Sequence, residues 1–155
     1  MAASRKSSRG TKDPFRLQDT VRLSAAGAGM LLGDLEHRVL AAAWAARRPA
    51  TARELFERVA RTHDVVYITC VTVANRLVEK GILQRAKLGD VYHYTATLTK
   101  AEFTQRVSRH VVQRLMTLGS SAVAASLVDV LAERDPEQLA ELARLVKAKM
   151  KEQDE

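Results

Sequence analysis

The sequence contains a single cysteine, Cys70, among its 155 residues, which excludes an internal disulfide and a cysteine-rich metal site. It has no apolar run near the roughly 18 residues that suggest a membrane span. The basic start MAASRKSSRG has no apolar segment behind it, so we expect no secretory signal, no membrane partner and a cytoplasmic location. Gly-rich phosphate loops, nucleophile elbows and close carboxylate pairs are also missing, so we predict no catalytic site and no cofactor.

Positive charge is what the sequence has in excess. Lysine and arginine number 25 against 18 aspartate and glutamate, which gives a formal charge of +7 and a pI near 9.9. The net charge is +4 over residues 1–30, +3 over residues 31–99 and zero over residues 100–155. This charge favours an anionic partner for the first two thirds, but charge by itself does not distinguish nucleic acid from a membrane surface, and many proteins are basic for no sharper reason.

Residues 1–30 are rich in Ser, Gly, Ala and Arg and show no sustained apolar period, which predicts a disordered basic arm. Such an arm can follow phosphates or enter a minor groove, or it can be a solubilising tail.

Local signals place two helices at the start of the next region. The stretch LEHRVLAAAWAA, with Asp34 as its expected N-cap, has a helical apolar period and carries Trp44 as a core anchor. Thr51 and Glu54 have the spacing of a capping box, which predicts a second, short helix to about Arg61.

A third helix and a hairpin follow. The stretch YITCVTVANRLVEKG predicts a helix over residues 67–80 that ends at Gly81. Over residues 82–96 the apolar period changes from 3.6 to 2, and LGD supplies a turn, which predicts a β-hairpin. The predicted fold of residues 31–98 is a winged helix-turn-helix, mainly α with a small β-hairpin wing.

The third helix has two unlike faces. One carries an ordinary core stripe that includes Cys70, Val73 and Leu77. The other is small, partly apolar and carries one charge, whereas a solvated helix normally offers Glu, Lys and Gln there. A slim helix that contacts base edges in a major groove needs such residues, and wing cations can hold phosphates. The predicted DNA-binding residues are Ile68, Thr69, Val71, Thr72, Asn75, Arg76, Arg85 and Lys87. A protein-interaction face with only non-specific DNA affinity is the alternative.

Residues 99–155 show three amphipathic helical patterns and no strand, and Thr99 with Glu102 makes a second capping box. Their apolar stripes can pack back on the winged helix or pair with a second chain. We predict a homodimer, because two recognition helices then address half-sites about 34–36 Å apart in a palindromic operator. The predicted dimerisation residues are Val107, Val111, Leu115, Leu118, Leu127, Leu131, Leu142 and Val146.

The stretches LGDLEHRVLAAAW, ATARELFERVA, YITCVTVANRLVEKG and VYHYTA resemble the penicillinase-repressor family of the BlaI/MecI/CopY type, from about Leu32 to Met150. The resemblance implies a bacterial homodimeric transcriptional repressor, active at the nucleoid, that binds double-stranded operator DNA through its winged helix and dimerises through its C-terminal helices. It also implies that Thr69, Thr72 and Arg76 face the DNA.

Two family switches are missing from the sequence. Family members that respond to β-lactams are cleaved at an Asn-Phe bond, and this chain has His110-Val111 at the corresponding place. The copper-responsive branch has a Cys-x-Cys motif near its C-terminus, which the stretch KAKMKEQDE lacks. The inducer and any sensor partner therefore stay unassigned. Cys70 is expected to be a buried structural thiol, with a redox switch as the alternative. The four histidines show no ligand spacing on one helix, so no metal site is predicted.

Overall fold

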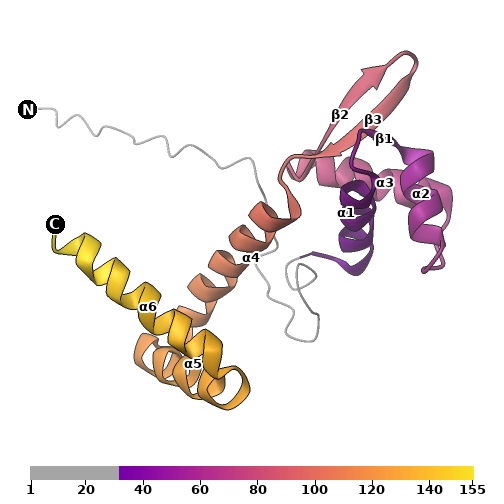
Figure 1. Ribbon diagram of the computed structural model, residues 1–155. Coiled ribbons are helices and arrows are strands. Elements are labelled where there is room, and N and C mark those ends of the chain that lie inside the picture. The colour runs from indigo at the N-terminus through magenta and orange to yellow at the C-terminus, as the bar shows by residue number, and fades with distance from the viewer. Residues whose placement is uncertain (1–31) are drawn as a thin grey trace, which may run out of the picture. The chain divides into compact units, whose positions relative to one another are not determined.

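The computed structural model describes residues 32–155, so the arm predicted over residues 1–30 lies outside the described part (Figure 1). Contacts divide the chain into two compact units, one that continues to Ser108 and one over Arg109–Glu155. The predicted boundary at residue 98 falls earlier than this division. The reason is that Phe103 and Val107, which follow that boundary, are buried in the first unit.

The first unit is a three-helix cluster with a small antiparallel sheet, and the β2–β3 hairpin extends from the helices (Figure 1). The sheet order is β1-β3-β2. This confirms the mainly helical fold with a hairpin wing. The elements are α1 (Asp34–Ala46), β1 (Ala50–Thr51), α2 (Ala52–Ala60), α3 (Tyr67–Glu79), β2 (Leu83–Leu88) and β3 (Val91–Ala96).

Local chemistry sets the ends of these elements. The Thr51 hydroxyl accepts from the Glu54 backbone N–H at 3.2 Å, and the Thr51 N–H donates to the Glu54 carboxylate at 2.9 Å, so the predicted capping box is present. Gly81 has φ +75°, the left-handed conformation that ends α3. The expected cap of α1 is wrong by one residue, because Gly33 is the N-cap and Asp34 instead pairs with Arg38 at 3.2 Å.

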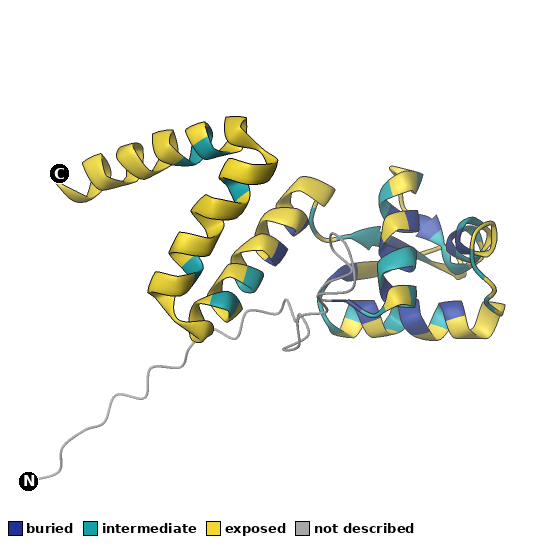
Figure 2. Cartoon of the chain, turned by 90° about the horizontal axis from the view of Figure 1, so that it is seen from below, coloured by how far each residue is buried: buried dark blue, intermediate teal, exposed yellow. Residues whose placement is uncertain are grey.

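The core of the first unit lies where the apolar faces of α1, α2 and α3 meet the sheet, and most of the buried residues in Figure 2 belong to this unit. Leu40, Leu55 and Leu77 supply one fully buried leucine from each helix. Trp44 is half-buried: its ring contacts Phe103 edge to face at 5.4 Å and its Nε1 donates to the Leu98 carbonyl at 3.0 Å. It is therefore a core anchor, as predicted, with its polar atom satisfied.

The second unit is helical, and α4 (Lys100–Leu115) runs into it from the first. After a short 3₁₀ helix over Met116–Leu118, Gly119 with φ +122° separates α4 from α5 (Ser120–Arg134). The Asp135 carboxylate then accepts from the Gln138 N–H at 3.3 Å and caps α6 (Pro136–Gln153). Neither α5 nor α6 contains a buried residue (Figure 2). Over residues 32–155, no helix has both the length and the apolar character needed to cross a membrane.

Candidate nucleic-acid interface

The solvent side of α3 carries an exposed ridge formed by Ile68, Thr69, Thr72 and Arg76. Ile68 is 68% exposed, although it is a large apolar residue on a folded surface. The Thr72 hydroxyl donates its proton to the Ile68 carbonyl at 2.9 Å, so its oxygen can only accept from a ligand. The ridge thus offers apolar groups, hydroxyl oxygens and one guanidinium, which are the groups that contact base edges in a major groove.

A second edge of α3 faces the wing. Tyr67, Val71 and Asn75 follow one another at intervals of four, so they lie in one row along the helix. Together with the N-terminus of α2 and strands β2 and β3, this row lines a groove of about 510 Å³. Val71 and Asn75 are half-buried, unlike the residues of the ridge. The face predicted as one reading surface is therefore divided between an exposed ridge and a groove wall.

Asn75 joins α3 to the wing through its side-chain oxygen. Arg85 of β2 donates to Asn75 Oδ1 at 2.9 Å, and the Tyr94 hydroxyl of β3 donates to the same atom at 2.8 Å. Burial raises the pKa of Tyr94, against an opposing effect of the Arg85 guanidinium, so the phenol keeps the proton that it donates. Two residues predicted as separate DNA contacts, Asn75 and Arg85, are thus in contact with each other.

Aromatic rings hold the cations on both sides of this groove. The Arg85 guanidinium lies 4.6 Å from the centre of the Tyr92 ring, and the Lys87 ammonium lies 5.9 Å from the same ring. On the α2 side, the Arg53 guanidinium lies 4.8 Å from the Tyr67 ring. A cation over an aromatic face keeps its position without being neutralised, so both guanidiniums stay available to an anion.

Sequence reasoning missed Arg53, Tyr67, Tyr92 and Tyr94 at this site. The spacing of four between Tyr67, Val71 and Asn75 was readable from the sequence and could have placed Tyr67 beside them. Arg53 gave no such signal, because only the packing of α2 on α3 brings it over the Tyr67 ring.

A partly buried ion pair and a buried cysteine lie where α3 packs against the rest of the first unit. The Lys80 ammonium donates to both carboxylate oxygens of Glu36 at 2.8 and 2.9 Å, which ties the end of α3 to α1. Cys70 has no exposed surface, and burial raises the pKa of its thiol. A thiol in this environment is inert, which supports the structural reading of Cys70 over the redox switch.

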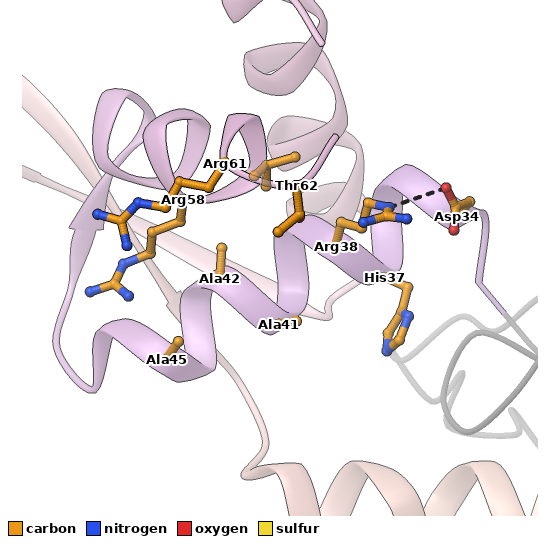
Figure 3. Close-up of a pocket in the computed structure, with 10 residues that line it drawn as sticks. Asp34, His37, Arg38, Ala41, Ala42, Ala45, Arg58, Arg61 and Thr62 are labelled. Atoms are coloured by element: carbon orange, nitrogen blue, oxygen red, sulfur yellow. Dashed lines mark hydrogen bonds and ion pairs between the residues drawn. The ribbon is translucent and has the colours of Figure 1, made fainter. Parts of the chain in front are cut away.

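A second hollow, of about 490 Å³, lies between α1 and α2 (Figure 3). Arg58 and Arg61 stand beside each other at one end, and Arg38 pairs with Asp34 at the other (Figure 3). Burial lowers the pKa of His37 in its wall, against an opposing effect of Asp34. No residue predicted to bind DNA lines this hollow.

The predicted dimerisation residues differ in burial. Val107 is buried within the first unit, so it already has a place in the core of a single chain. Leu118, Leu127 and Val146 are exposed, with Leu118 at 77%. The others are half-buried: Val111, Leu115, Leu131 and Leu142.

Known proteins match this chain at modest identity. It is 32% identical over 63 residues to the transcriptional regulator BlaI of Mycobacterium tuberculosis, which covers 41% of this chain and 46% of BlaI. It is 29% identical over 93 residues to an uncharacterized 16.5 kDa protein of Latilactobacillus sakei, which covers 59% of this chain and 64% of that protein. The chain thus spans about half to two thirds of the length of these curated relatives.

Solved structures resemble the chain only distantly. A zinc-responsive MarR family member of Lactococcus lactis, ZitR, has a TM-score of 0.39 and 12% identity over 87% of this chain and 85% of its own. A structure from work on the DNA recognition and protein interaction domains of HOP2 has a TM-score of 0.37 and 19% identity over 40% of this chain and 97% of its own.

The family profile gives the broader match. The profile described as the penicillinase repressor matches residues 32–148, well over half of the chain, and confirms the resemblance carried by the helix and wing motifs. Transcriptional regulators are not enzymes, which agrees with the prediction that the chain has no catalytic site. The chain belongs to the penicillinase repressor family.

Proposed function

We propose that this protein is a bacterial transcriptional repressor that binds double-stranded DNA through the α3 ridge and the wing. The exposed ridge carries the proposal, because Ile68, Thr72 and Arg76 give it the mixed apolar, hydroxyl and guanidinium chemistry that reads base edges. Family membership supports the same reading. A regulator of this kind acts in the cytoplasm, where bacterial DNA lies.

The repressor is proposed to be a homodimer that binds a palindromic operator. Support comes from the second unit, whose helices α5 and α6 contain no buried residue, although they carry regularly spaced leucines and valines. Helices with uncovered apolar stripes need a partner surface, and a second copy of the same chain offers one of matching chemistry. A dimer presents two recognition helices, and a two-fold axis between them matches an inverted repeat.

A winged-helix interaction module with only non-specific DNA affinity is the second candidate. The exposed apolar residues Val66 and Ile68 favour it, because such residues also mark protein-binding surfaces. This candidate predicts DNA binding that has no sequence preference and disappears as the salt concentration rises.

Selection of bound duplexes from a random pool, at physiological salt and with the full chain, separates the two candidates. An enriched inverted repeat is expected for a dimeric repressor, with affinity well above that for random duplex, by about 10³-fold or more. A single enriched half-site would support sequence-specific DNA binding and contradict the proposed dimer. An unenriched pool would remove the repressor proposal and direct the search to a protein partner.

A further inference from the structure

Asn75 has no accepting capacity left for a DNA base. Its Oδ1 accepts from Arg85 at 2.9 Å and from the Tyr94 hydroxyl at 2.8 Å, which uses both lone pairs of a carbonyl oxygen. The orientation of the amide is also fixed, because a guanidinium only donates and the atom facing it has to be the oxygen. Among residues 32–155 no group accepts from the amide N–H₂ of Asn75, so this group is left to bind a ligand, and it can only donate.

This arrangement is incompatible with the usual role of asparagine on a recognition helix. Asparagine reads adenine through two bonds, in which its oxygen accepts from the base N6–H and its nitrogen donates to N7. In this protein the first of these bonds has no free acceptor. A free N–H₂ group can donate to a phosphate oxygen. Because the phosphates are alike at every base pair, such a contact carries no sequence preference.

The groove beside Asn75 has the chemistry of a phosphate site. Arg53 stands over Tyr67 on the α2 side and Arg85 over Tyr92 on the wing side, at 4.8 and 4.6 Å. Asp90, at the hairpin turn, is the one acidic residue in the described lining of the groove. Two positioned guanidiniums, phenol groups and one amide donor complement a phosphodiester, and guanidinium is the side-chain cation that binds phosphate best in a fixed geometry.

The position of a helix in the DNA major groove indicates what binds in the groove beside α3. A helix in the major groove has a sugar–phosphate backbone along each of its sides, because the two strands form the walls of that groove. On one side of α3 stands the wing, and the space between them is the groove of about 510 Å³. The strand on that side therefore has to pass between α3 and the hairpin when the ridge contacts the bases.

We propose that the groove between α3 and the wing receives the sugar–phosphate backbone of one DNA strand, and that Asn75 is a positioning residue that fixes the wing to α3 and does not read adenine. The proposal rests on the proposed DNA-binding function. It assigns base reading to the ridge and backbone binding to Arg53, Arg85 and the Asn75 amide. Sequence preference and strand affinity then reside on two different edges of the same helix.

The first test compares the sequence preferences of Asn75→Ala and Arg76→Ala by selection from a random duplex pool. Asn75→Ala is expected to keep the wild-type motif and to bind every sequence about tenfold more weakly, because it loses a backbone contact and loosens the wing. Arg76→Ala is expected to relax the motif at one position. If Asn75→Ala instead loses a preference for adenine at one position, Asn75 reads that base and the proposal is overturned.

The second test measures amide hydrogen exchange in the free protein, so it does not depend on DNA. Loss of the two bonds in Asn75→Ala should make the amides of β2 and β3 exchange about tenfold faster. Asn75→Asp should keep exchange slow, since the carboxylate still accepts from Arg85 and Tyr94, but should bind DNA more weakly than Asn75→Ala because it brings negative charge to a phosphate. Unchanged exchange in Asn75→Ala would remove the positioning role.

The third test counts phosphate contacts. Arg53→Ala is expected to lower the slope of log affinity against log salt by about 0.9, and Arg134→Ala, which removes the same charge from α5, should leave the slope unchanged. An unchanged slope for Arg53→Ala would overturn the groove as a backbone site. If the wild-type protein selects no motif, the repressor proposal fails. The salt slope on random duplex still tests whether the groove binds a DNA backbone, and hydrogen exchange still tests whether Asn75 positions the wing.

Discussion

At the scale of single residues, Arg76 is the exposed guanidinium of the ridge, and within residues 32–155 no acidic side chain forms an ion pair with it. Arg76→Ala is therefore expected to cost about 1–3 kcal/mol of operator binding if the guanidinium pairs with a base. Operator affinity measured by fluorescence anisotropy checks this. Equal affinity of Arg76→Ala and the wild type would show that the ridge is not the reading surface.

Lys87 supplies a contrast with Arg76. It lies on β2 near the hairpin turn, over the Tyr92 ring, and is expected to hold a phosphate. Lys87→Ala should weaken binding to operator and random duplex by the same factor and reduce the salt slope by about 0.9. A change in base preference in this variant would contradict the division between wing and ridge.

Cys70 is fully buried on the core side of α3, and burial raises the pKa of its thiol. Because the thiolate is the reactive species, the folded protein should react with a disulfide reagent about a hundredfold or more slowly than the protein in denaturant. Treatment with peroxide should leave DNA affinity unchanged. Rapid labelling of the folded protein at neutral pH would instead support a redox switch at Cys70.

The pair between Lys80 and Glu36 tests the anchoring of α3. The Glu36 side chain is only 9% exposed, so Lys80→Ala leaves a nearly buried carboxylate without its cation. We expect a loss of about 1–3 kcal/mol in the free energy of unfolding, measured in urea, reduced from the value for a fully buried pair because Lys80 is partly exposed. The double variant Glu36→Gln with Lys80→Met should recover part of the loss, and a larger loss in the double variant would contradict this account.

At the scale of elements, the start of α2 depends on the capping box of Thr51 and Glu54. Thr51→Ala should lower the free energy of unfolding by about 1 kcal/mol, because it removes the acceptor for the Glu54 N–H. Glu54→Gln is the matched variant, since glutamine keeps the cap bond and loses the charge.

The same cap has a pH dependence. A side-chain bond from Arg48, and then the Thr51 N–H, hold the pKa of Glu54 below its usual value. A carboxylate with a lowered folded-state pKa stabilises the fold above its unfolded pKa of about 4.3, and this contribution is lost as the pH falls through the folded-state pKa. The stability difference between wild type and Glu54→Gln should therefore shrink below about pH 4.3. A constant difference down to pH 2 would contradict this.

Elements with strong local signals were predictable from the sequence. Thr51 marked the start of α2, and Gly81 with the change of period after it marked the end of α3 and the start of the hairpin. Each of these signals depends on side chains a few residues apart. Strand β1 escaped prediction because it has only two residues and exists through its pairing of Thr51 with His93. The bonds of Asn75 escaped for the same reason: Arg85 and Tyr94 reach it only after the hairpin has folded back on α3.

At the scale of the whole molecule, charge and apolar surface are separated along the chain. Residues 100–155 have no net charge, while the excess of lysine and arginine lies before them. The exposed large apolar residues of the second unit, among them Val128, Leu145 and Met150, lie in this neutral part. A neutral apolar surface can pair with its own copy without electrostatic repulsion, which agrees with a homodimer that leaves the basic part free for an anion.

The dimer is tested on α6, where Val146 is 47% exposed. Val146→Glu places a charge in the proposed interface, so the variant is expected to sediment as one chain in analytical ultracentrifugation, where the wild type sediments as two. Lys147→Glu changes the charge of the same helix by more but leaves its apolar stripe intact, and it should stay dimeric.

Loss of the dimer should weaken binding to the full inverted repeat by about 10²-fold or more, since each half-site then binds alone, and leave binding to one half-site unchanged. A wild-type protein that sediments as one chain, or a Val146→Glu variant that still sediments as two, would contradict the pairing of chains through this stripe.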